Sequence, residues 1–221
     1  MIRHVIFDLD GTLVDSCADC VAILSDMLVE RGSEYLIDPV AARPWMSKGG
    51  VEMVSALLGK ECVSPEADLA EFRARYKEFK TPKNSLFNGV SEGLERLGAT
   101  EASLAICSNK PEMLCERVLE DVGVAVHFDA VVGWKDGMRQ KPHPDLIDET
   151  LKLLDTDPRH CVFVGDSKLD SELAYQANMP FYFVSYGYAE NGWSPSSDSL
   201  TFDSFSRLTD ALVGQLHEQY V

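Results

Sequence analysis

Two aspartates at the end of the first apolar run are the residues best suited to chemistry. Asp8 and Asp10 stand in Asp8-Leu-Asp10-Gly11-Thr12, directly after the run Val5–Phe7. Residues two apart in an extended chain point to the same side, so these carboxylates repel one another unless a proton or a cation lies between them. Asp-Gly is also common in turns, but a turn does not explain why Asp8 ends a buried strand.

A second pair of acids, Asp166 and Asp170, follows the run Cys161–Val164. Their spacing of four puts both on one face of a helix, where acidic side chains can also serve only as caps. Together with Asp8 and Asp10 they supply three or four carboxylates. Hard oxygen ligands without nearby Cys or His favour Mg²⁺ over zinc, so the sequence predicts a magnesium site.

Groups that could bind an anion stand at two further positions. Ser108 and Asn109 follow the run Leu104–Cys107, where a hydroxyl and backbone N–H groups at a helix start suit phosphate. Lys141 precedes two prolines that restrict its backbone. The alternatives are that Ser108 is a helix cap and that Lys141 is an ordinary surface lysine.

The elements that must position these residues alternate between strand and helix. Short apolar runs without alternation indicate strands covered on both faces, and segments with helical spacing separate them. This order predicts a doubly wound parallel α/β sheet, in which ligands bind outside the carboxyl ends of the strands. The predicted strands are Val5–Phe7, Leu104–Cys107, Ala130–Val132, Cys161–Val164 and Phe181–Val184.

Residues 15–83 interrupt the alternation, because they show helical stripes but no strand over a length far beyond an ordinary loop. We predict an α-helical subdomain here, inserted into a core of residues 1–14 and 84–221. Arg43 or Lys48 could meet a carboxylate on a small substrate, and Gly49-Gly50 would allow close backbone approach. Equally, the two cations could be surface charges and the glycines a helix start.

Composition limits the partners. The 221 residues include 36 acidic and 20 basic ones, a formal net charge of −16. Such a chain repels nucleic acid and anionic membranes, and an anionic substrate would need a metal or focused Lys and Arg.

The apolar run near the first residue is too short for a signal peptide, and no segment is long and apolar enough to span a membrane. Six scattered cysteines suit a reducing cytoplasm, with Cys17 and Cys20 as small helix residues rather than zinc ligands.

Taken together, the motifs resemble the haloacid dehalogenase superfamily. Its first motif is matched by Asp8–Ser16, its second by Ser108-Asn-Lys110, its third by Lys141 and its fourth by Gly165–Asp170. The helical insertion resembles the superfamily's α-helical (C1-type) cap. Within the superfamily, the chain is most similar to the phosphoglycolate phosphatase-like branch, which the second motif and Tyr186-Gly-Tyr188 also match. Trp134-Lys135 departs from the branch pattern of smaller or acidic residues.

The resemblance implies a mechanism for the acids. Asp8 would attack phosphorus and form an aspartyl phosphate, while Asp10 would act as general acid and base. Mg²⁺ would be held by Asp8, the backbone carbonyl of Asp10 and Asp166, with Asp170 supporting the site. Because a halide leaves without a proton, the acid at position 10 argues against dehalogenation.

The resemblance also implies how the substrate is bound. Ser108, the Asn109 backbone N–H and Lys141 would hold the phosphoryl oxygens, with Thr12 as a further substrate-binding residue. The expected partner is a small phosphorylated metabolite such as phosphoglycolate, hydrolysed by a monomer or homodimer. A sugar phosphomutase of the β-phosphoglucomutase type and a pyrophosphatase using the same site are the alternatives.

Overall fold

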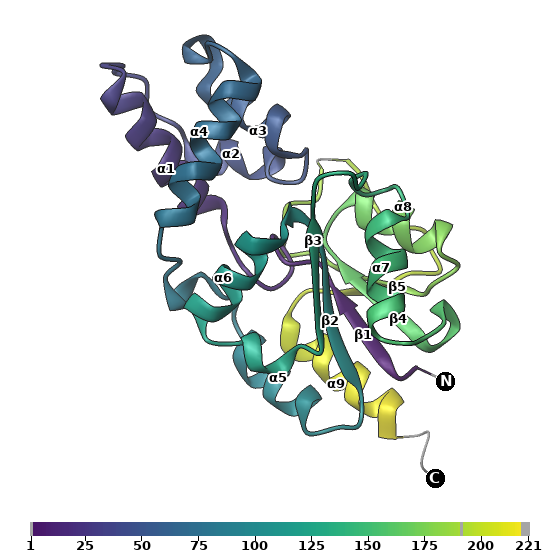
Figure 1. Cartoon of the computed structure of the whole chain (residues 1–221). Coiled ribbons are helices and arrows are strands. Elements are labelled where there is room, and N and C mark those ends of the chain that lie inside the picture. Colours follow the sequence, from purple (N-terminus) through teal and green to yellow (C-terminus); the bar gives the residue numbers. More distant parts are fainter. Residues whose placement is uncertain (1, 191, 218–221) are drawn as a thin grey trace.

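A computed structural model describes residues 2–190 and 192–217 and shows one parallel sheet between helical layers (Figure 1). The strand order is β3-β2-β1-β4-β5-β6, with every neighbouring pair parallel. This confirms the predicted doubly wound α/β fold. The strands are β1 (His4–Phe7), β2 (Ser103–Pro111), β3 (Ala130–Trp134), β4 (Cys161–Gly165), β5 (Phe181–Val184) and β6 (Leu200–Phe202).

The five predicted strands all form, and burial explains why their sequences lack alternation. Val5, Ile6 and Phe7 of β1 are fully buried, since β1 lies in the middle of the sheet with helices on both faces. The sixth strand, β6, was not predicted. It is three residues long, lies at the sheet edge and is largely exposed, so it lacks the apolar run that marks the others.

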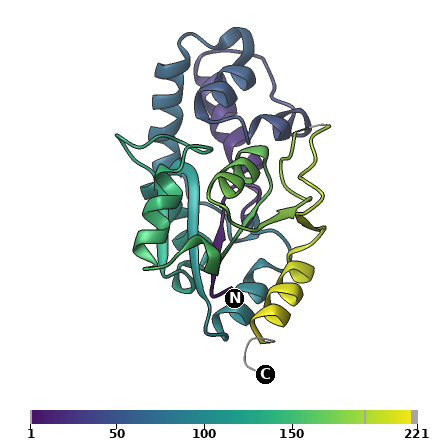
Figure 2. The same ribbon diagram turned by 90° about the vertical axis from the view of Figure 1, so that its right-hand side faces the viewer.

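Helices cover the two faces of the sheet unequally (Figures 1 and 2). One hydrophobic cluster joins the sheet to α5 (Val90–Gly98), α6 (Glu112–Val122) and α9 (Phe205–His217). A second cluster joins the other face to α7 (Asp145–Leu153) and α8 (Lys168–Gln176). Both layers leave free the end of the sheet where the motif residues stand.

Four helices between β1 and β2 gather beyond this end of the sheet, and we call them the cap (Figure 1). They are α1 (Cys17–Glu30), α2 (Pro39–Ala42), α3 (Gly50–Leu58) and α4 (Pro65–Glu78), and α4 packs against α1 and α3. The chain enters and leaves the cap through neighbouring segments, because the backbone N–H of Asp15 donates to the carbonyl of Ser85 at 2.7 Å. The division into residues 15–83 and the remainder stays a prediction.

Two further features of the chain are the state of its cysteines and the length of its apolar helices. All six cysteines are free thiols. Among the helices of the described residues, none has the length and apolar character needed to cross a membrane.

Candidate active site

A cavity of about 120 Å³ lies between the cap and the carboxyl ends of the strands. The sheet side contributes the motif residues that the sequence singled out, and the cap side contributes mainly apolar and aromatic side chains together with one arginine. Its lining includes Asp8, Asp10, Ser108, Asn109, Lys110, Lys141 and Asp166 from the core, and Gly49, Gly50, Met53, Leu69, Phe72, Arg73 and Tyr76 from the cap.

A bulge at the end of β2 turns the Ser108–Lys110 segment into this cavity. Ser108 pairs with Gly133 of β3, but the next paired residue of β2 is Pro111, so two residues are left without a partner on β3. Bulges of this kind re-aim side chains beside active sites. Gly133 makes the bulge possible, because a Cβ there would collide with the backbone of Glu112 and Lys110.

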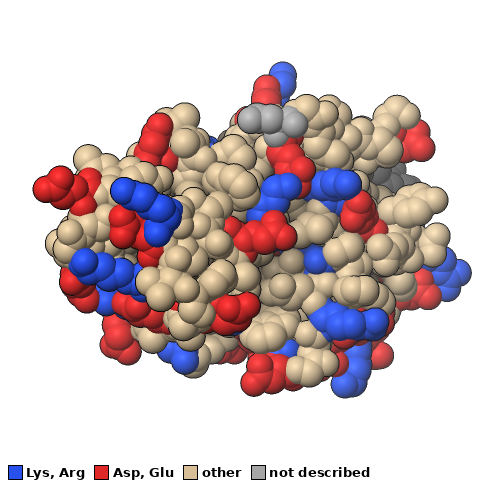
Figure 3. Space-filling model, turned by 90° about the horizontal axis from the view of Figure 1, so that it is seen from above, with Lys and Arg blue, Asp and Glu red and all other residues tan. Residues whose placement is uncertain are grey.

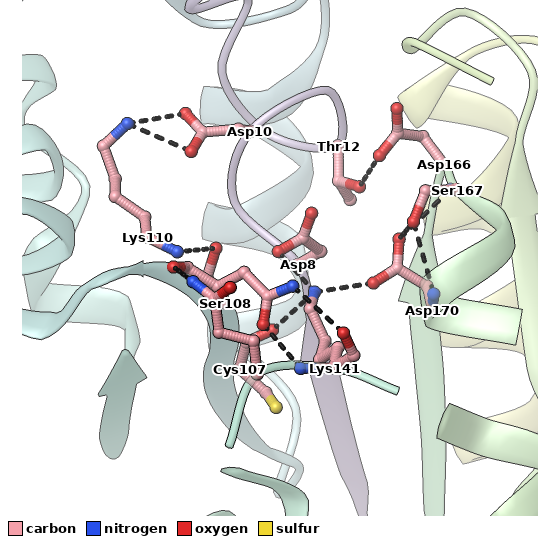
Figure 4. A network of polar contacts seen from close by, with 12 residues as sticks. Asp8, Asp10, Thr12, Cys107, Ser108, Lys110, Lys141, Asp166, Ser167 and Asp170 are labelled. Carbon is pink, nitrogen blue, oxygen red and sulfur yellow. Dashed lines mark hydrogen bonds and ion pairs between the residues drawn. The ribbon is translucent and has the colours of Figure 1, made fainter. Parts of the chain in front are cut away.

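Lys141 lies at the centre of a buried polar network (Figure 4). Its Nζ donates to Asp8 Oδ1 at 2.8 Å and to Asp170 Oδ1 at 2.6 Å. The side chain of Asn109 holds the backbone of this lysine, accepting from its N–H at 2.7 Å and donating to its carbonyl at 3.4 Å. Asn109 therefore positions Lys141, a contact that the sequence did not reveal.

Three buried carboxylates converge beside that lysine. Asp8, Asp166 and Asp170 each offer an oxygen within 4.8 Å of the others. Burial raises the pKa of Asp8 to about 6 despite the opposing effect of Lys141. Burial, reinforced by Asp170 and Asp8, also raises the pKa of Asp166 well above its usual range. One ammonium does not balance three carboxylates, so this all-oxygen donor set fits a hard divalent cation.

The loop after β5 fixes the orientation of Asp166. The backbone N–H of Tyr188 donates to Asp166 Oδ2, and the Thr12 hydroxyl donates to Oδ1 at 3.4 Å. A Cβ at Gly11 or Gly187 would collide with this carboxylate, so both positions require glycine. The structure thus places Thr12 behind Asp166 and outside the cavity lining. Its contact with substrate stays a prediction.

Asp10 faces away from the carboxylate cluster and is held by Lys110 (Figure 4). Nζ of Lys110 lies 2.9 and 3.0 Å from the two carboxylate oxygens. The same ammonium stands 4.4 Å from the centre of the Tyr76 ring, which the cap contributes. Burial is the largest single influence and lowers the pKa of Lys110, but Asp10 together with Tyr76 and Cys20 outweighs it, so the pKa lies well above its usual range. From the sequence, Lys110 was matched only as the last residue of the second motif, although its place directly after Ser108-Asn109 was a usable signal of a role in the site.

Arg43 and Lys48, the cap cations predicted to meet substrate, bind elsewhere. Arg43 pairs with Asp15 at 3.0 Å and donates to the carbonyl of Tyr186 at 3.3 Å. Lys48 pairs with Glu190 at 2.6 Å. Neither lines the cavity, because each is drawn to an acid at the junction of cap and core. Their contact with substrate stays a prediction, and their observed contacts attach the cap to the loop after β5.

The cap residues that do line the cavity came only partly from sequence reasoning. Gly49 and Gly50 line it and also stand at the start of α3, as the alternative interpretation expected, while their close approach to substrate stays a prediction. Arg73 and Tyr76 of α4 also line it. Neither was predicted to line a site, because helical spacing does not show which helix faces a cavity made by two subdomains.

Comparisons with known proteins agree with this geometry. The sequence model of the family described as haloacid dehalogenase-like hydrolase matches residues 5–184. The chain is 31% identical over 220 residues to the phosphoglycolate phosphatase of Rhodobacter capsulatus, covering 97% of this chain and 98% of the relative. It is 34% identical over 187 residues to the phosphoglycolate phosphatase of Xanthomonas campestris pv. campestris (strain 8004), covering 84% of each chain.

Solved structures show the same fold. The crystal structure of a putative phosphoglycolate phosphatase from Lactobacillus delbrueckii subsp. bulgaricus superposes with a TM-score of 0.82 at 24% identity, covering 96% of this chain and 98% of that one. A predicted phosphoglycolate phosphatase from Haemophilus somnus superposes with a TM-score of 0.80 at 24% identity, with the same coverage. The predicted family and enzyme class are therefore confirmed: the chain belongs to the haloacid dehalogenase-like hydrolases and is a phosphoric monoester hydrolase of the phosphoglycolate phosphatase-like branch.

Proposed function

We propose that this enzyme hydrolyses 2-phosphoglycolate or a closely similar small phosphomonoester, with Mg²⁺ and through an aspartyl phosphate on Asp8. The observation that carries the proposal is the position of Asp8. Its carboxylate lines the cavity, one oxygen is bound to Lys141, and a second acid, Asp10, lines the same cavity without joining the cluster. The names of the two relatives support the choice of substrate.

Asp8 is the nucleophile in this mechanism. Its hydrogen bond to Lys141 orients one carboxylate oxygen, and its other oxygen attacks phosphorus. The lysine ammonium, the Ser108 hydroxyl and the backbone N–H of Asn109 stabilise the charge on the phosphoryl oxygens in the transition state. Lys141 suits this work because Asn109 and two carboxylates hold it in place.

The carboxylate cluster would hold Mg²⁺, with Asp8 and Asp166 as side-chain ligands and Asp10 contributing its backbone carbonyl. Asp170 would act through Lys141, to which it is bound. When bound, the ion would neutralise the repulsion between the Asp8 carboxylate and an incoming phosphate.

Asp10 moves the proton. In the first step it protonates the oxygen of the departing alcohol, and in the second it takes a proton from the water that hydrolyses the aspartyl phosphate. Lys110 holds both of its oxygens, so the acid is fixed in orientation before substrate enters. The proposal includes a cytoplasmic location and a cap of residues 15–83 that closes over the substrate.

Release of inorganic phosphate from 2-phosphoglycolate, measured with and without Mg²⁺, tests the proposal. We expect turnover that requires the metal, and its loss in Asp8→Asn. Asp148→Asn is the matched control, since Asp148 is exposed on α7, and it should keep full activity. Turnover by Asp8→Asn at the level of the control would show that Asp8 is not the nucleophile. Conversion of a sugar phosphate into its isomer without free phosphate would instead identify a mutase.

A further inference from the structure

Arg73 of α4 brings an unpaired charge to the cavity. Its side chain is half-buried and lines the cavity, and its guanidinium carbon lies 5.0 Å from the centre of the Trp134 ring. Within the described part of the chain no hydrogen bond or ion pair joins Arg73 to another residue. Arg75 of the same helix, by contrast, binds Glu30 and Glu71. The guanidinium donors of Arg73 are therefore free for a ligand.

Trp134 keeps this arginine in place. The indole Nε1 donates to the carbonyl of Met138 at 2.8 Å, which fixes the ring on which the guanidinium stacks. Burial lowers the pKa of Arg73 and nearby Asp136 opposes this effect, yet an arginine stays charged at neutral pH. Trp134 is also the position at which the sequence departs from the branch pattern, so the departure coincides with the platform beneath Arg73.

The start of α3 adjoins the same guanidinium. Gly49 precedes this helix and supplies no side-chain cap, so the first backbone N–H groups of α3 lack a helical or capping acceptor. Gly50 lies so close that a Cβ on it would stand 3.7 Å from Nη2 of Arg73. Both glycines line the cavity. Backbone donors and the guanidinium thus converge on one region, where an anion is favoured.

Tyr76 leaves a further polar group of α4 unpaired. It lies one turn after Arg73 on α4 and lines the same cavity, and it is only 2% exposed. Its hydroxyl has no hydrogen-bond partner among the described residues, although buried hydroxyls are normally paired. This helix therefore carries two polar groups that the described protein residues do not pair.

We propose that Arg73 and the start of α3 bind a carboxylate on the alcohol that leaves, which makes this enzyme selective for short phosphorylated hydroxy acids. The inference rests on the proposed function and adds the residue that selects the substrate. Among the cations that line the cavity, Lys141 is bound by Asp8 and Asp170, and Lys110 is bound by Asp10. That leaves Arg73, whose planar fork of donors matches a carboxylate.

The proposed function favours a carboxylate over a second phosphate at this subsite. Both are anions that a guanidinium binds well. The second anionic group of 2-phosphoglycolate, the substrate proposed above, is a carboxylate. We therefore assign the subsite to a carboxylate, and a bisphosphate becomes one arm of the test.

The test compares kcat/KM for three substrates, all with Mg²⁺. They are 2-phosphoglycolate, its analogue in which an uncharged amide replaces the carboxylate, and fructose 1,6-bisphosphate. The wild-type enzyme should prefer the acid over the amide by about 10- to 100-fold, the range expected for a charge-assisted pair of hydrogen bonds. Arg73→Met should remove most of that preference, and Arg73→Lys should restore part of it. Arg75→Met is the matched control on the same helix and should leave the preference unchanged.

Three outcomes overturn the inference. The first is a wild-type enzyme that does not distinguish the acid from the amide, a measurement that does not depend on whether any variant folds. The second is an Arg73→Met variant whose activity falls equally on both, which would mean a structural role. The third is an Arg73→Met variant that loses activity on fructose 1,6-bisphosphate but keeps the preference for the acid over the amide. All three differ from failure of the proposed function, in which wild-type enzyme releases no phosphate from any of these esters or Asp8→Asn stays active.

Discussion

Replacing Lys110 with methionine should slow the chemical step without removing the nucleophile. In the structure the Lys110 ammonium donates to both oxygens of Asp10, and the two side chains are 8% and 21% exposed. Hydrogen bonds to a charged group contribute about 1.5–3 kcal/mol, which corresponds to about 10- to 150-fold in rate if the acid works only when held. Removing a general acid costs about 10²- to 10⁴-fold, so Lys110→Met should be less damaging than Asp10→Asn.

The assay compares two leaving groups. An alkyl phosphate needs a proton on its departing oxygen, whereas 4-nitrophenolate departs readily without one. We expect Lys110→Met to reduce kcat strongly for 2-phosphoglycolate. For 4-nitrophenyl phosphate, the rate at which the aspartyl phosphate forms, followed as the burst of nitrophenolate, should fall much less. Methionine fills most of the volume of the lysine, and a thermal melt checks that Tyr76 of the cap still packs on residue 110.

A double-mutant cycle decides whether Lys110 acts through Asp10. If it does, Lys110→Met should have little further effect on kcat in an Asp10→Asn background, because residues that act as a unit are not additive. Two rate losses that simply multiply would refute the reasoning, since Lys110 would then contribute independently of the acid. Equal losses with both leaving groups would refute it as well.

Three further predictions follow from contacts around the site. Burial raises the pKa of Asp19 from 3.8 to about 6, although Ser85 opposes this effect, so stability falls as pH rises through this interval. Asp19→Asn should therefore raise the free energy of unfolding, measured by urea denaturation. We expect an increase of about 1–3 kcal/mol at about pH 8 and almost none at about pH 3. Gly187→Ala should weaken metal binding at least about 10-fold by calorimetry, because a Cβ there collides with Asp166, whereas Gly214→Ala, which has open space, should not. Tyr188→Phe should lower the free energy of unfolding by about 1–3 kcal/mol, because its hydroxyl accepts from the Cys17 N–H at 3.0 Å and donates to Asp15 at 2.6 Å, and an unchanged value would contradict this.

The fold was predictable because its strands are buried on both faces. Runs such as Val5–Phe7 and Cys161–Val164 cannot alternate when both sides of the sheet are covered, and that absence of alternation identified them. Edge strand β6 has no such run, and helix α2 is a single turn begun by Asp38, so neither leaves a periodic signal. Local pattern thus identified the long and buried elements and missed the short and exposed ones.

The site divides in the same way between local and long-range information. Asp8, Asp166 and Lys141 each follow a strand, so knowing the sheet was enough to bring them together. The contacts between cap and core depend on how two subdomains meet, which no spacing records. Arg43 was predicted to bind an anion and Arg73 was not, because the sequence does not record that Asp15 lies beside one and Trp134 beside the other.

The net charge of −16 makes the placement of the few cations informative. Seen from above, acidic and basic side chains are interspersed on this face, and the described residues form no broad positive patch on it (Figure 3). Many surface cations, such as Arg75 and Arg139, are engaged by neighbouring acids. A substrate with two anionic groups must therefore be held by charges inside the cavity, where low dielectric strengthens them. Lys141, Arg73 and the carboxylate cluster with its cation would each meet a different part of the molecule, so selectivity arises from spacing of charge within the cavity rather than from attraction at the surface.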